Sequence, residues 1–405
     1  MMTARSALLV DCEDVAWFRD GPDGARGTAA KLGRRIGLGE QRTAELVLAV
    51  AELAANLTKH ATDGSLLLRI LRNHAALAGD VVAGVEVITV DSGPGMADVP
   101  AALRDGMSTT STLGIGLGAV ERLADTFTIH SRPGTGTVQL ARFWPHPVPP
   151  ALSGEAAVGG ITRPISGEQV CGDAWAARID TGTSTGVGTA VARVEGTADA
   201  GPPLAAAPDW SMMTGGPRQQ PAAARSGASA PVHAAVPGPG DGLLVMSCDG
   251  LGHGPLASLA AQAAVNAFRT GNGRTPEQAM EEVHRALRGT RGAAVAIARL
   301  ESDGRVLFCG VGNITAALLT ATSRANLLSH PGIAGHQMHR LRTHEYRLPA
   351  QGMLVMHSDG LSDRWSPADL TGLLHHPPAV IATALLRQAG TRRDDASAVI
   401  AKAAR

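Results

Sequence analysis

Apolar residues recur at helical spacing near the start of the chain. Leu46, Val50, Leu53 and Leu57 follow one another at intervals of four, three and four residues. This period places all four on one side of a helix, where they would form a single buried stripe. We therefore predict a helix over residues 40–61.

Strand and hairpin patterns alternate with helical ones over the rest of residues 1–144. The turn sequence Pro133-Gly134-Thr135-Gly136 separates two strand-like runs and predicts a hairpin. The predicted elements are a buried strand, a helix and the two hairpin strands, at residues 85–90, 117–125 and 127–143.

Two stretches of unusual composition divide the chain. Prolines crowd residues 145–150, and at this density they exclude a helix or a central strand. Residues 181–241 are rich in Ala, Gly, Pro, Ser and Thr, so they cannot bury enough apolar surface to offset the entropy of ordering. The predicted organisation is a first domain at residues 1–144, a linker at 145–160 and a second domain at 161–405. The second domain contains a largely disordered insert at about residues 181–241.

The second domain contains one pattern twice, an apolar strand that ends in Asp-Gly. It occurs at residues 243–250 and again at residues 353–360. Two helices and then two strands with a short turn are predicted between them, at residues 255–268, 276–287, 293–300 and 306–310.

Charge and composition exclude several classes of protein. Lys plus Arg total 36 and Asp plus Glu total 36, which argues against nucleic acid or an anionic membrane as the main partner. No apolar run reaches the roughly 18 residues of a transmembrane helix, and the N-terminus lacks the apolar core of a signal peptide, so we expect a cytoplasmic protein. The four cysteines are far apart and fit neither a zinc site nor a disulfide framework, at positions 12, 171, 248 and 309.

A polar stripe runs along the first predicted helix, away from the leucines. Glu45, Glu52 and Asn56 lie seven and four residues apart, so they share one face. Such a stripe is either a solvated surface or a binding face, and the pattern alone leaves both open.

Two glycine-containing segments follow this helix. Asp91 ends a predicted strand and precedes Gly93 and Gly95, which allow a ligand to approach the backbone closely. The Gly-Ile-Gly-Leu-Gly segment at 114–118 leads into a helix, whose first N–H groups favour phosphate. Its spacing is neither GxGxxG nor a Walker loop, so Rossmann and P-loop sites are unsupported.

In this order and spacing, the segments resemble the GHKL superfamily of ATPases and kinases, and within it the bacterial anti-sigma-factor and stress-switch serine kinases. The resemblance covers nearly all of residues 1–144 and implies an ATP site. It implies that Glu52 is the base toward the acceptor serine hydroxyl, that Asn56 holds Mg²⁺ between the ATP phosphates, and that Asp91 contacts adenine. By the same resemblance, Gly93 and Gly95 would belong to the loop that contacts adenine, and Gly114, Gly116 and Gly118 would form part of the ATP lid.

The second domain offers carboxylates as metal ligands. Two unit charges about 4 Å apart repel by about 4 kcal/mol at an effective dielectric of about 20, so a carboxylate cluster implies bound cations. All-oxygen ligation favours Mg²⁺ or Mn²⁺, and two such ions can activate a water for attack on phosphorus. The acids are Asp173, Asp249, Asp359 and the pair Asp394-Asp395.

These segments resemble the metal-dependent serine/threonine phosphatases, and within them the SpoIIE (stage II sporulation protein E) group. The strongest matches are at residues 248–254, 310–313, 357–360 and 394–397. The resemblance runs from about residue 161 to 401, omitting the insert, and implies a β-sandwich flanked by helices. It also implies two Mn²⁺ or Mg²⁺ ions held by Asp173, Asp249, Asp359, Asp394 and the carbonyl of Gly250.

The chain departs from this family at one position. Many relatives carry a second acid three residues after the first, where this chain has Ala176, so an additional, loosely held metal is in doubt. Asp394 is preferred to Asp395 because the first acid of the pair aligns with the family's ligand. His253 is either an acid or a structural residue of its loop, and the Gly-Asn pair at 312–313 fits a tight turn better than a catalytic pair.

The predicted fold class is α+β, with an N-terminal GHKL-type α/β sandwich and a C-terminal phosphatase β-sandwich. The two resemblances imply a regulator that adds and removes phosphate on a Ser or Thr of a small sigma-factor antagonist-type (STAS-like) domain in a bacterial stress or partner-switching pathway. Two alternatives stay open. In the first alternative, the first domain is a non-catalytic ATP-binding clamp that controls the phosphatase. In the second, the chain is a scaffold with two degenerate sites.

Overall fold

The first domain is built around one antiparallel sheet with the strand order β1-β2-β3-β5-β4. The computed structural model describes residues 10–19, 21–73, 82–104, 116–149, 152, 154–180, 242–338 and 340–402, which belong to one compact unit. The insert predicted at 181–241 lies outside the described residues. In the described ranges, no helix is both long enough and apolar enough to span a membrane.

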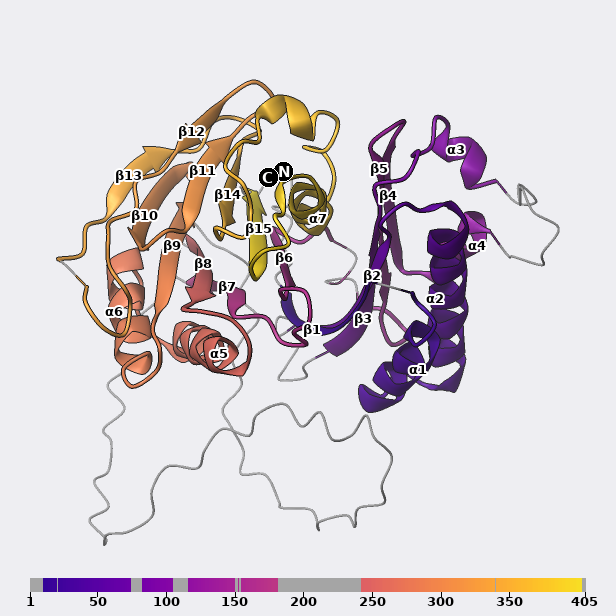
Figure 1. Ribbon diagram of the computed structural model, residues 1–405, viewed down its shortest axis with the longest axis horizontal. Helices are drawn as coiled ribbons and strands as arrows, with labels where there is room; N and C mark the ends of the chain where they lie inside the picture. Colours follow the sequence, from indigo (N-terminus) through magenta and orange to yellow (C-terminus); the bar gives the residue numbers. More distant parts are fainter. Residues whose placement is uncertain are drawn as a thin grey trace, which may run out of the picture. The chain divides into compact units, whose positions relative to one another are not determined.

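Helices cover one face of this sheet (Figure 1). The strands are β1 (Asp11–Phe18), β2 (Ser65–Asn73), β3 (Val82–Val90), β4 (Thr126–Arg132) and β5 (Gly136–Phe143). The helices are α1 (Ala25–Arg35), α2 (Glu40–His60), the short α3 (Val99–Ala102) and α4 (Leu117–Leu123). The predicted first helix, the second helix and the hairpin are thereby confirmed, with ends shifted by one or two residues.

The leucine stripe of α2 packs onto the sheet as its period predicts. Leu46, Val50 and Leu53 are fully buried in one cluster with Leu66 and Leu68 of β2. Burying an aliphatic side chain of this size stabilises the fold by about 1.5–3 kcal/mol. This packing fixes the rotation of α2 and therefore the direction of its polar face.

The second domain consists of two stacked antiparallel sheets with helices outside them (Figure 1). One sheet has the order β13-β10-β9-β8-β7, and the other has the order β12-β11-β14-β15-β6. The strands of the first sheet are β7 (Asp173–Asp180), β8 (Gly242–Gly250), β9 (Ala293–Glu301), β10 (Arg305–Val311) and β13 (His344–Arg347). Those of the second are β6 (Val158–Arg163), β11 (Thr315–Leu319), β12 (Arg324–Asn326), β14 (Met353–His357) and β15 (Ala396–Lys402).

Three apolar layers hold this sandwich together. One cluster fills the space between the two sheets, and it includes Val245 of β8 and Met356 of β14. A second cluster joins the first sheet to α5 (Pro255–Thr270) and α6 (Pro276–Ala286). Next to the other sheet lies α7 (Pro378–Ala389), which follows the 3₁₀ turn at Pro367–Leu370. The expected β-sandwich flanked by helices is therefore present, although β6 begins inside the predicted linker range.

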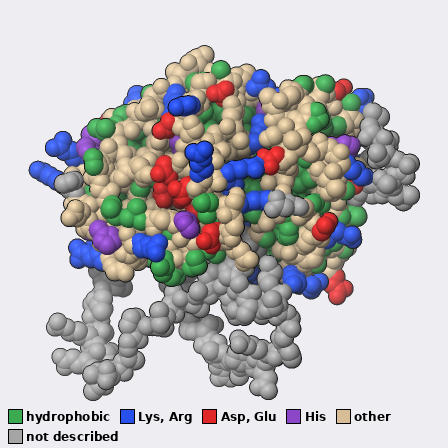
Figure 2. Space-filling view, viewed as in Figure 1, with side chains coloured by type: hydrophobic (Ala, Val, Ile, Leu, Met, Phe, Trp, Pro, Cys, Tyr) green, Lys and Arg blue, Asp and Glu red, His purple; other side chains and the backbone are tan. Residues whose placement is uncertain are grey.

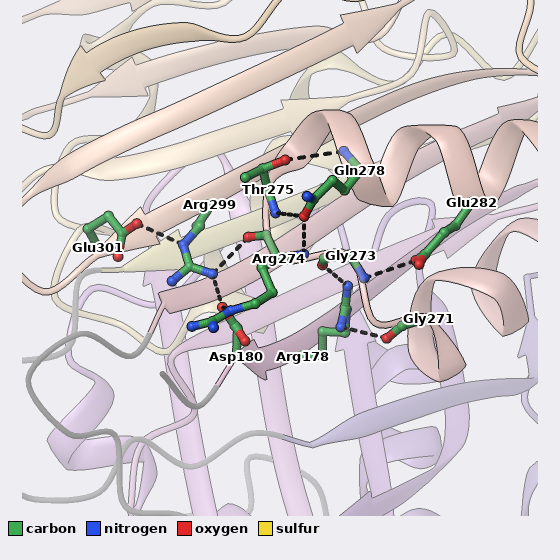
Figure 3. Close-up of polar contacts among 10 residues, drawn as sticks. All are labelled: Arg178, Asp180, Gly271, Gly273, Arg274, Thr275, Gln278, Glu282, Arg299 and Glu301. Carbon is green, nitrogen blue, oxygen red and sulfur yellow. Dashed lines mark hydrogen bonds and ion pairs between the residues drawn. The ribbon is translucent and has the colours of Figure 1, made fainter. Parts of the chain in front are cut away.

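The two chain ends that flank the insert are neighbours in the first sheet. Asp180, the last residue of β7, pairs with Gly242, the first of β8. Arg299 pairs with Asp180 and Glu301 and donates to the carbonyl of Arg274, as Figure 3 shows. The insert therefore replaces a turn between two strands whose ends are held by this polar network.

Candidate functional site

The polar face of α2 carries two of the predicted nucleotide residues. Glu52 and Asn56 are half-buried, and within the described residues neither side chain makes a hydrogen bond. Glu45 differs, because its carboxylate accepts hydrogen bonds from Arg42 (2.7 Å) and Gln41 (3.1 Å). Arg42 lowers the pKa of Glu45 accordingly, despite partial burial. The Glu45 carboxylate is therefore occupied by structural hydrogen bonds. Of the three residues in the polar stripe, Glu52 and Asn56 are the two without a hydrogen bond within the described residues.

Arg42 anchors the helix in a way that the sequence pattern did not reveal. Its guanidinium is almost fully buried, pairs with Asp125, and donates to the carbonyls of Leu123 and Trp144. Asp125 in turn accepts from the backbone N–H of Trp144 at 2.7 Å. These long-range bonds fix the start of α2 against the end of α4 and the end of β5.

The loop after β3 lies against the end of α2. The Asp91 Oδ1 atom accepts from the N–H of Gly93 at 2.8 Å, and the N–H of Ser92 donates to the carbonyl of Thr62 at 2.8 Å. A Cβ atom on Gly93 would lie 2.9 Å from the carbonyl oxygen of His60. Burial raises the pKa of Asp91, while the hydrogen bond from Gly93 opposes this shift. The loop that carries Asp91 therefore lies beside the C-terminal end of α2, which ends one turn after Asn56.

Two of the predicted lid glycines lie at the start of α4. Gly116 is the residue before the helix and has φ +76°, a conformation that favours glycine, and Gly118 is buried within it. Gly95 has φ +67°, and a Cβ atom there would lie 2.0 Å from the carbonyl oxygen of Arg132. Gly114 lies outside the described residues.

Strand register brings the first two acids of the second domain together. Asp173 starts β7 and pairs directly with Asp249 near the end of β8. Asp173 is buried, and its Oδ2 atom accepts from the Ser358 hydroxyl at 2.5 Å. Its other oxygen, Oδ1, is buried with no hydrogen-bond partner among the described residues. A buried carboxylate oxygen without a donor is a position that a cation would satisfy.

The electrostatics show that the four predicted ligands face one region. Burial raises the pKa of Asp249, and the charges of Asp173, Asp359 and Asp394 raise it further. Burial likewise raises the pKa of Asp359, and Asp394 adds to the shift. These shifts mean that the negative charges are not compensated by nearby basic groups. Within the described ranges, however, no three His, Cys, Asp or Glu side chains are grouped closely enough to hold a metal ion.

The two acids after α7 have different partners. The Asp395 side chain is buried, and its two oxygens accept from the backbone N–H groups of Ile165 and Gly172, each at 2.7 Å. Asp394 is exposed and accepts only the N–H of Asp395 in the described structure, at 2.9 Å. Asp395 thus holds two loops in place, whereas Asp394 keeps lone pairs free, an arrangement that favours Asp394 as the ligand.

Glycines allow the loops around the acids to pack closely. A Cβ atom on Gly250 would lie 2.5 Å from the carbonyl oxygen of Ala257, and one on Gly360 would lie 1.9 Å from that of Asp395. The N–H of Gly250 donates to the carbonyl of Gly172 at 3.0 Å. Larger residues at either position would push the Asp249 and Asp359 segments away from their neighbours.

The structure adds to the sequence interpretation at two positions near the acids. Asn313 does more than form a turn, because its Nδ2 atom donates to Asp359 Oδ2 at 2.6 Å. Ala176 belongs to the core cluster between the first sheet and its helices, on the opposite side of β7 from Trp175. Because Asp173 and Trp175 share a side of the strand, position 176 faces away from the acids. His253 lies near Glu168, 3.4 Å from its carboxylate, and remains exposed.

Charge on the surface follows no single sign. Figure 2 shows one face of the molecule, on which acidic and basic side chains are interspersed. This agrees with the zero formal net charge of the whole chain.

Comparison with protein families matches two parts of the chain. Residues 23–142 match the family of the histidine kinase-like ATPase domain, and residues 239–404 match stage II sporulation protein E (SpoIIE). The serine/threonine-protein kinase RsbT of Bacillus subtilis (strain 168) is 32% identical over 120 residues, which are 30% of this chain and 86% of RsbT.

Two solved structures are similar to the chain at low identity. RsbX in complex with magnesium is 16% identical, with a TM-score of 0.40, over 60% of this chain and 92% of RsbX. The phosphatase domain of SpoIIE from Bacillus subtilis, with a fragment of its regulatory domain, is 11% identical, with a TM-score of 0.39, over 78% of each chain.

Proposed function

Since the chain belongs to the RsbT-related family of histidine kinase-like ATPase domains and also carries a SpoIIE phosphatase domain, we propose that it adds phosphate to a protein partner and removes it at two separate sites. The observation that carries this proposal is the presence of two spatially ordered residue sets, each within its own domain. One lies on α2 and the loop after β3, and the other lies at the ends of β7, β8 and β14 and directly before β15.

In the kinase-like domain, Glu52 and Asn56 on the polar face of α2 have separate roles. Glu52 accepts the proton of the acceptor hydroxyl, and Asn56 holds the Mg²⁺ that accompanies ATP. Asp91 binds the amino group of adenine, and the nearby glycines let the nucleotide approach the backbone. Phosphoryl transfer depends mainly on such positioning and charge stabilisation, so few catalytic groups suffice.

In the phosphatase domain, the oxygen donors present are of the kind that divalent cations prefer, although the described side chains are not grouped closely enough to enclose one. The unpartnered Oδ1 atom of Asp173 and the raised pKa values of Asp249 and Asp359 indicate a carboxylate set that lacks positive charge. Asp173, Asp249, Asp359, Asp394 and the Gly250 carbonyl would hold two Mn²⁺ or Mg²⁺ ions, which supply Lewis acidity and an activated water when bound. Ser358 orients Asp173, and Asn313 orients Asp359.

The proposed substrate is a phosphoserine or phosphothreonine on a STAS-like sigma-factor antagonist-type protein in the cytoplasm. RsbT carries the name of a serine/threonine kinase, and this supports a protein hydroxyl as the acceptor. A chain with both domains sets the phosphorylation level of such a partner by the balance of its two reactions.

The test uses the full chain and the STAS-like protein encoded by the same organism. With Mg²⁺ and labelled ATP, we expect label on a Ser or Thr of that protein. With the phosphorylated protein and Mn²⁺, we expect release of phosphate. Tight ATP binding without phosphate transfer would identify the first domain as an ATP-binding clamp instead of a kinase. If the chain neither bound ATP nor released phosphate from the phosphorylated protein, the proposal would be contradicted.

A further inference from the structure

Helix α7 of the phosphatase domain packs against the kinase-like domain as well as its own sheet. Its residues Val380, Ile381 and Leu385 are fully buried. They share one apolar cluster with Ile88 of β3 and Val138 of β5, among others. The face of the first sheet that carries no helix of its own domain is thus covered by a helix of the other domain.

Buried charge reinforces this contact between the domains. Arg69 of β2 is fully buried, bonds to Glu86 Oε1 at 2.7 Å, and also donates to the carbonyl of Gly160 in β6 at 2.7 Å. Arg142 bonds to the other oxygen of Glu86 at 2.6 Å. Burial alone would raise the pKa of Glu86, but the two arginines together lower it. Of these bonds, only the one from Arg69 to the carbonyl of Gly160 joins the two domains, and the pairing with Glu86 holds the Arg69 guanidinium in place to make it.

The last turn of α7 reaches the predicted adenine residue. Arg387 Nη1 donates to the carbonyl oxygen of Asp91 at 3.2 Å. A Cβ atom on Gly136 would lie 2.0 Å from the same oxygen, so this carbonyl is enclosed by a glycine and an arginine. The guanidinium also faces the Asp91 carboxylate charge and the positive charge of Arg132. Arg387 therefore holds the peptide group between Asp91 and Ser92, next to the Asp91 side chain.

The same end of α7 reaches the loops that carry two of the proposed metal ligands. The N–H of Thr391 donates to the carbonyl of Gly360 at 2.9 Å, next to Asp359. The N–H of Ser362 donates to the carbonyl of Ala389 at 2.8 Å. Asp394 follows a few residues later on the same segment. One short stretch of chain thus contacts the adenine loop and both metal-ligand loops.

From these contacts we propose that Arg387 is a positioning residue of the nucleotide site, supplied by the phosphatase domain, and that α7 couples ATP binding to metal binding. The inference rests on the proposed function of both sites. A nucleotide bound to the Asp91 side chain shifts the Asp91 backbone and so alters the hydrogen bond between its carbonyl and Arg387. Helix α7 then shifts the loops that carry Asp359 and Asp394. By thermodynamic linkage, metal binding then changes ATP affinity by the same factor.

The test compares Arg387→Met with Gln388→Met in the full chain. Gln388 is the exposed neighbour on the same helix and contacts Asp369 instead of the nucleotide loop. Calorimetry gives the affinity for Mg²⁺-ATP with and without Mn²⁺, and hydrolysis of p-nitrophenyl phosphate gives the apparent Mn²⁺ affinity with and without ATP. We expect Arg387→Met to bind ATP about tenfold more weakly and to lose the mutual effect of ATP and Mn²⁺.

Gln388→Met should keep the wild-type ATP affinity and the mutual effect. Arg387→Lys retains the charge and one donor, so it should recover part of both, and thermal unfolding shows whether each variant is folded. If folded Arg387→Met binds ATP as the wild type does and keeps the coupling, this inference is wrong while the proposed function stands. If the wild type binds no ATP, the proposed kinase function itself fails.

Discussion

The four acids proposed as metal ligands (Asp173, Asp249, Asp359 and Asp394, the acid cluster) differ from the residues proposed for the nucleotide site in what holds them in place. In the acid cluster, strand pairing aligns Asp173 with Asp249, and a hydroxyl and an amide fix the carboxylates of Asp173 and Asp359. In the proposed nucleotide site, Glu52 and Asn56 lie on a helix face and make no hydrogen bonds among the described residues. The acid cluster is therefore held side chain by side chain, whereas the nucleotide site is held through the placement of α2 and its neighbouring loops.

This difference shows where each site is vulnerable. A change that leaves the acids in place but removes a supporting side chain should impair the phosphatase alone. The proposed nucleotide site should depend more on the anchors that position α2, such as Arg42 at the opposite end of the helix from Asn56. The predictions that follow test this contrast in order of expected size.

The largest effect should come from Arg42→Met. The substitution removes the guanidinium that pairs with Asp125 and leaves that carboxylate, 14% exposed, without its main partner. Loss of one member of a buried pair typically costs about 3–5 kcal/mol. Urea unfolding of the full chain should show this loss, whereas Arg35→Met, which removes an exposed ion pair with Glu13, should change stability by about 1 kcal/mol or less. Equal effects of the two variants would remove Arg42 as the anchor of α2.

A smaller effect, confined to the phosphatase, should follow from Ser358→Ala. The variant leaves Asp173 Oδ2 buried without the hydroxyl donor that orients it. Loss of such a supporting bond typically lowers metal affinity by about 10- to 100-fold. Mn²⁺ titration of p-nitrophenyl phosphate hydrolysis measures this shift, with Ser362→Ala as the control on the same loop. Unchanged Mn²⁺ affinity in Ser358→Ala would show that Asp173 is not a ligand.

On α2, Asn56→Ala and Glu45→Gln should separate a binding group from a structural one. We expect Asn56→Ala to weaken Mg²⁺-ATP binding by about tenfold, the effect of losing roughly one charge-assisted bond. Glu45→Gln should leave the affinity within about twofold of the wild type, because Glu45 is occupied by Arg42. Calorimetry with the full chain distinguishes them, and a stronger effect of Glu45→Gln would restore Glu45 to the nucleotide face.

The smallest effect should come from replacing residues 181–241 with a two-residue Asn-Gly turn. Asp180 and Gly242 are direct partners in the ladder, so a short hairpin turn can join them. Loop-closure entropy changes slowly with length, and Arg299 already holds this end of the sheet. Mn²⁺-dependent hydrolysis should stay within about twofold of the wild type. A large loss would assign the insert a role in the phosphatase reaction.

Local pattern was sufficient for much of the fold. The spacing of Leu46, Val50 and Leu53 predicted the rotation of α2, and the turn at 133–136 predicted the hairpin. Helix α7 was not predicted, because ten of its twelve residues are buried and it shows no polar face that would reveal a helical period. A helix covered on both sides reads as an apolar run whose type the sequence leaves undefined.

Features that depend on distant contacts could not be predicted. The Arg42–Asp125 pair joins residues 83 positions apart, and the bond from Ser358 to Asp173 spans 185 positions. The separate tasks of Asp394 and Asp395 also depend on loops elsewhere in the chain, because Ile165 and Gly172 occupy the second carboxylate. The motifs marked which residue types matter, and the three-dimensional contacts decide which neighbour supports each one.

If two opposed reactions take place at two separate sites of one chain, each should be lost without the other when its own site is inactivated. Transfer of phosphate from ATP and release of phosphate from the phosphorylated STAS-like partner are measured side by side for Glu52→Ala and Asp249→Asn. We expect Glu52→Ala to lose transfer and retain release, and Asp249→Asn to lose release and retain transfer. Transfer at the wild-type rate in Glu52→Ala, or release at the wild-type rate in Asp249→Asn, would contradict it.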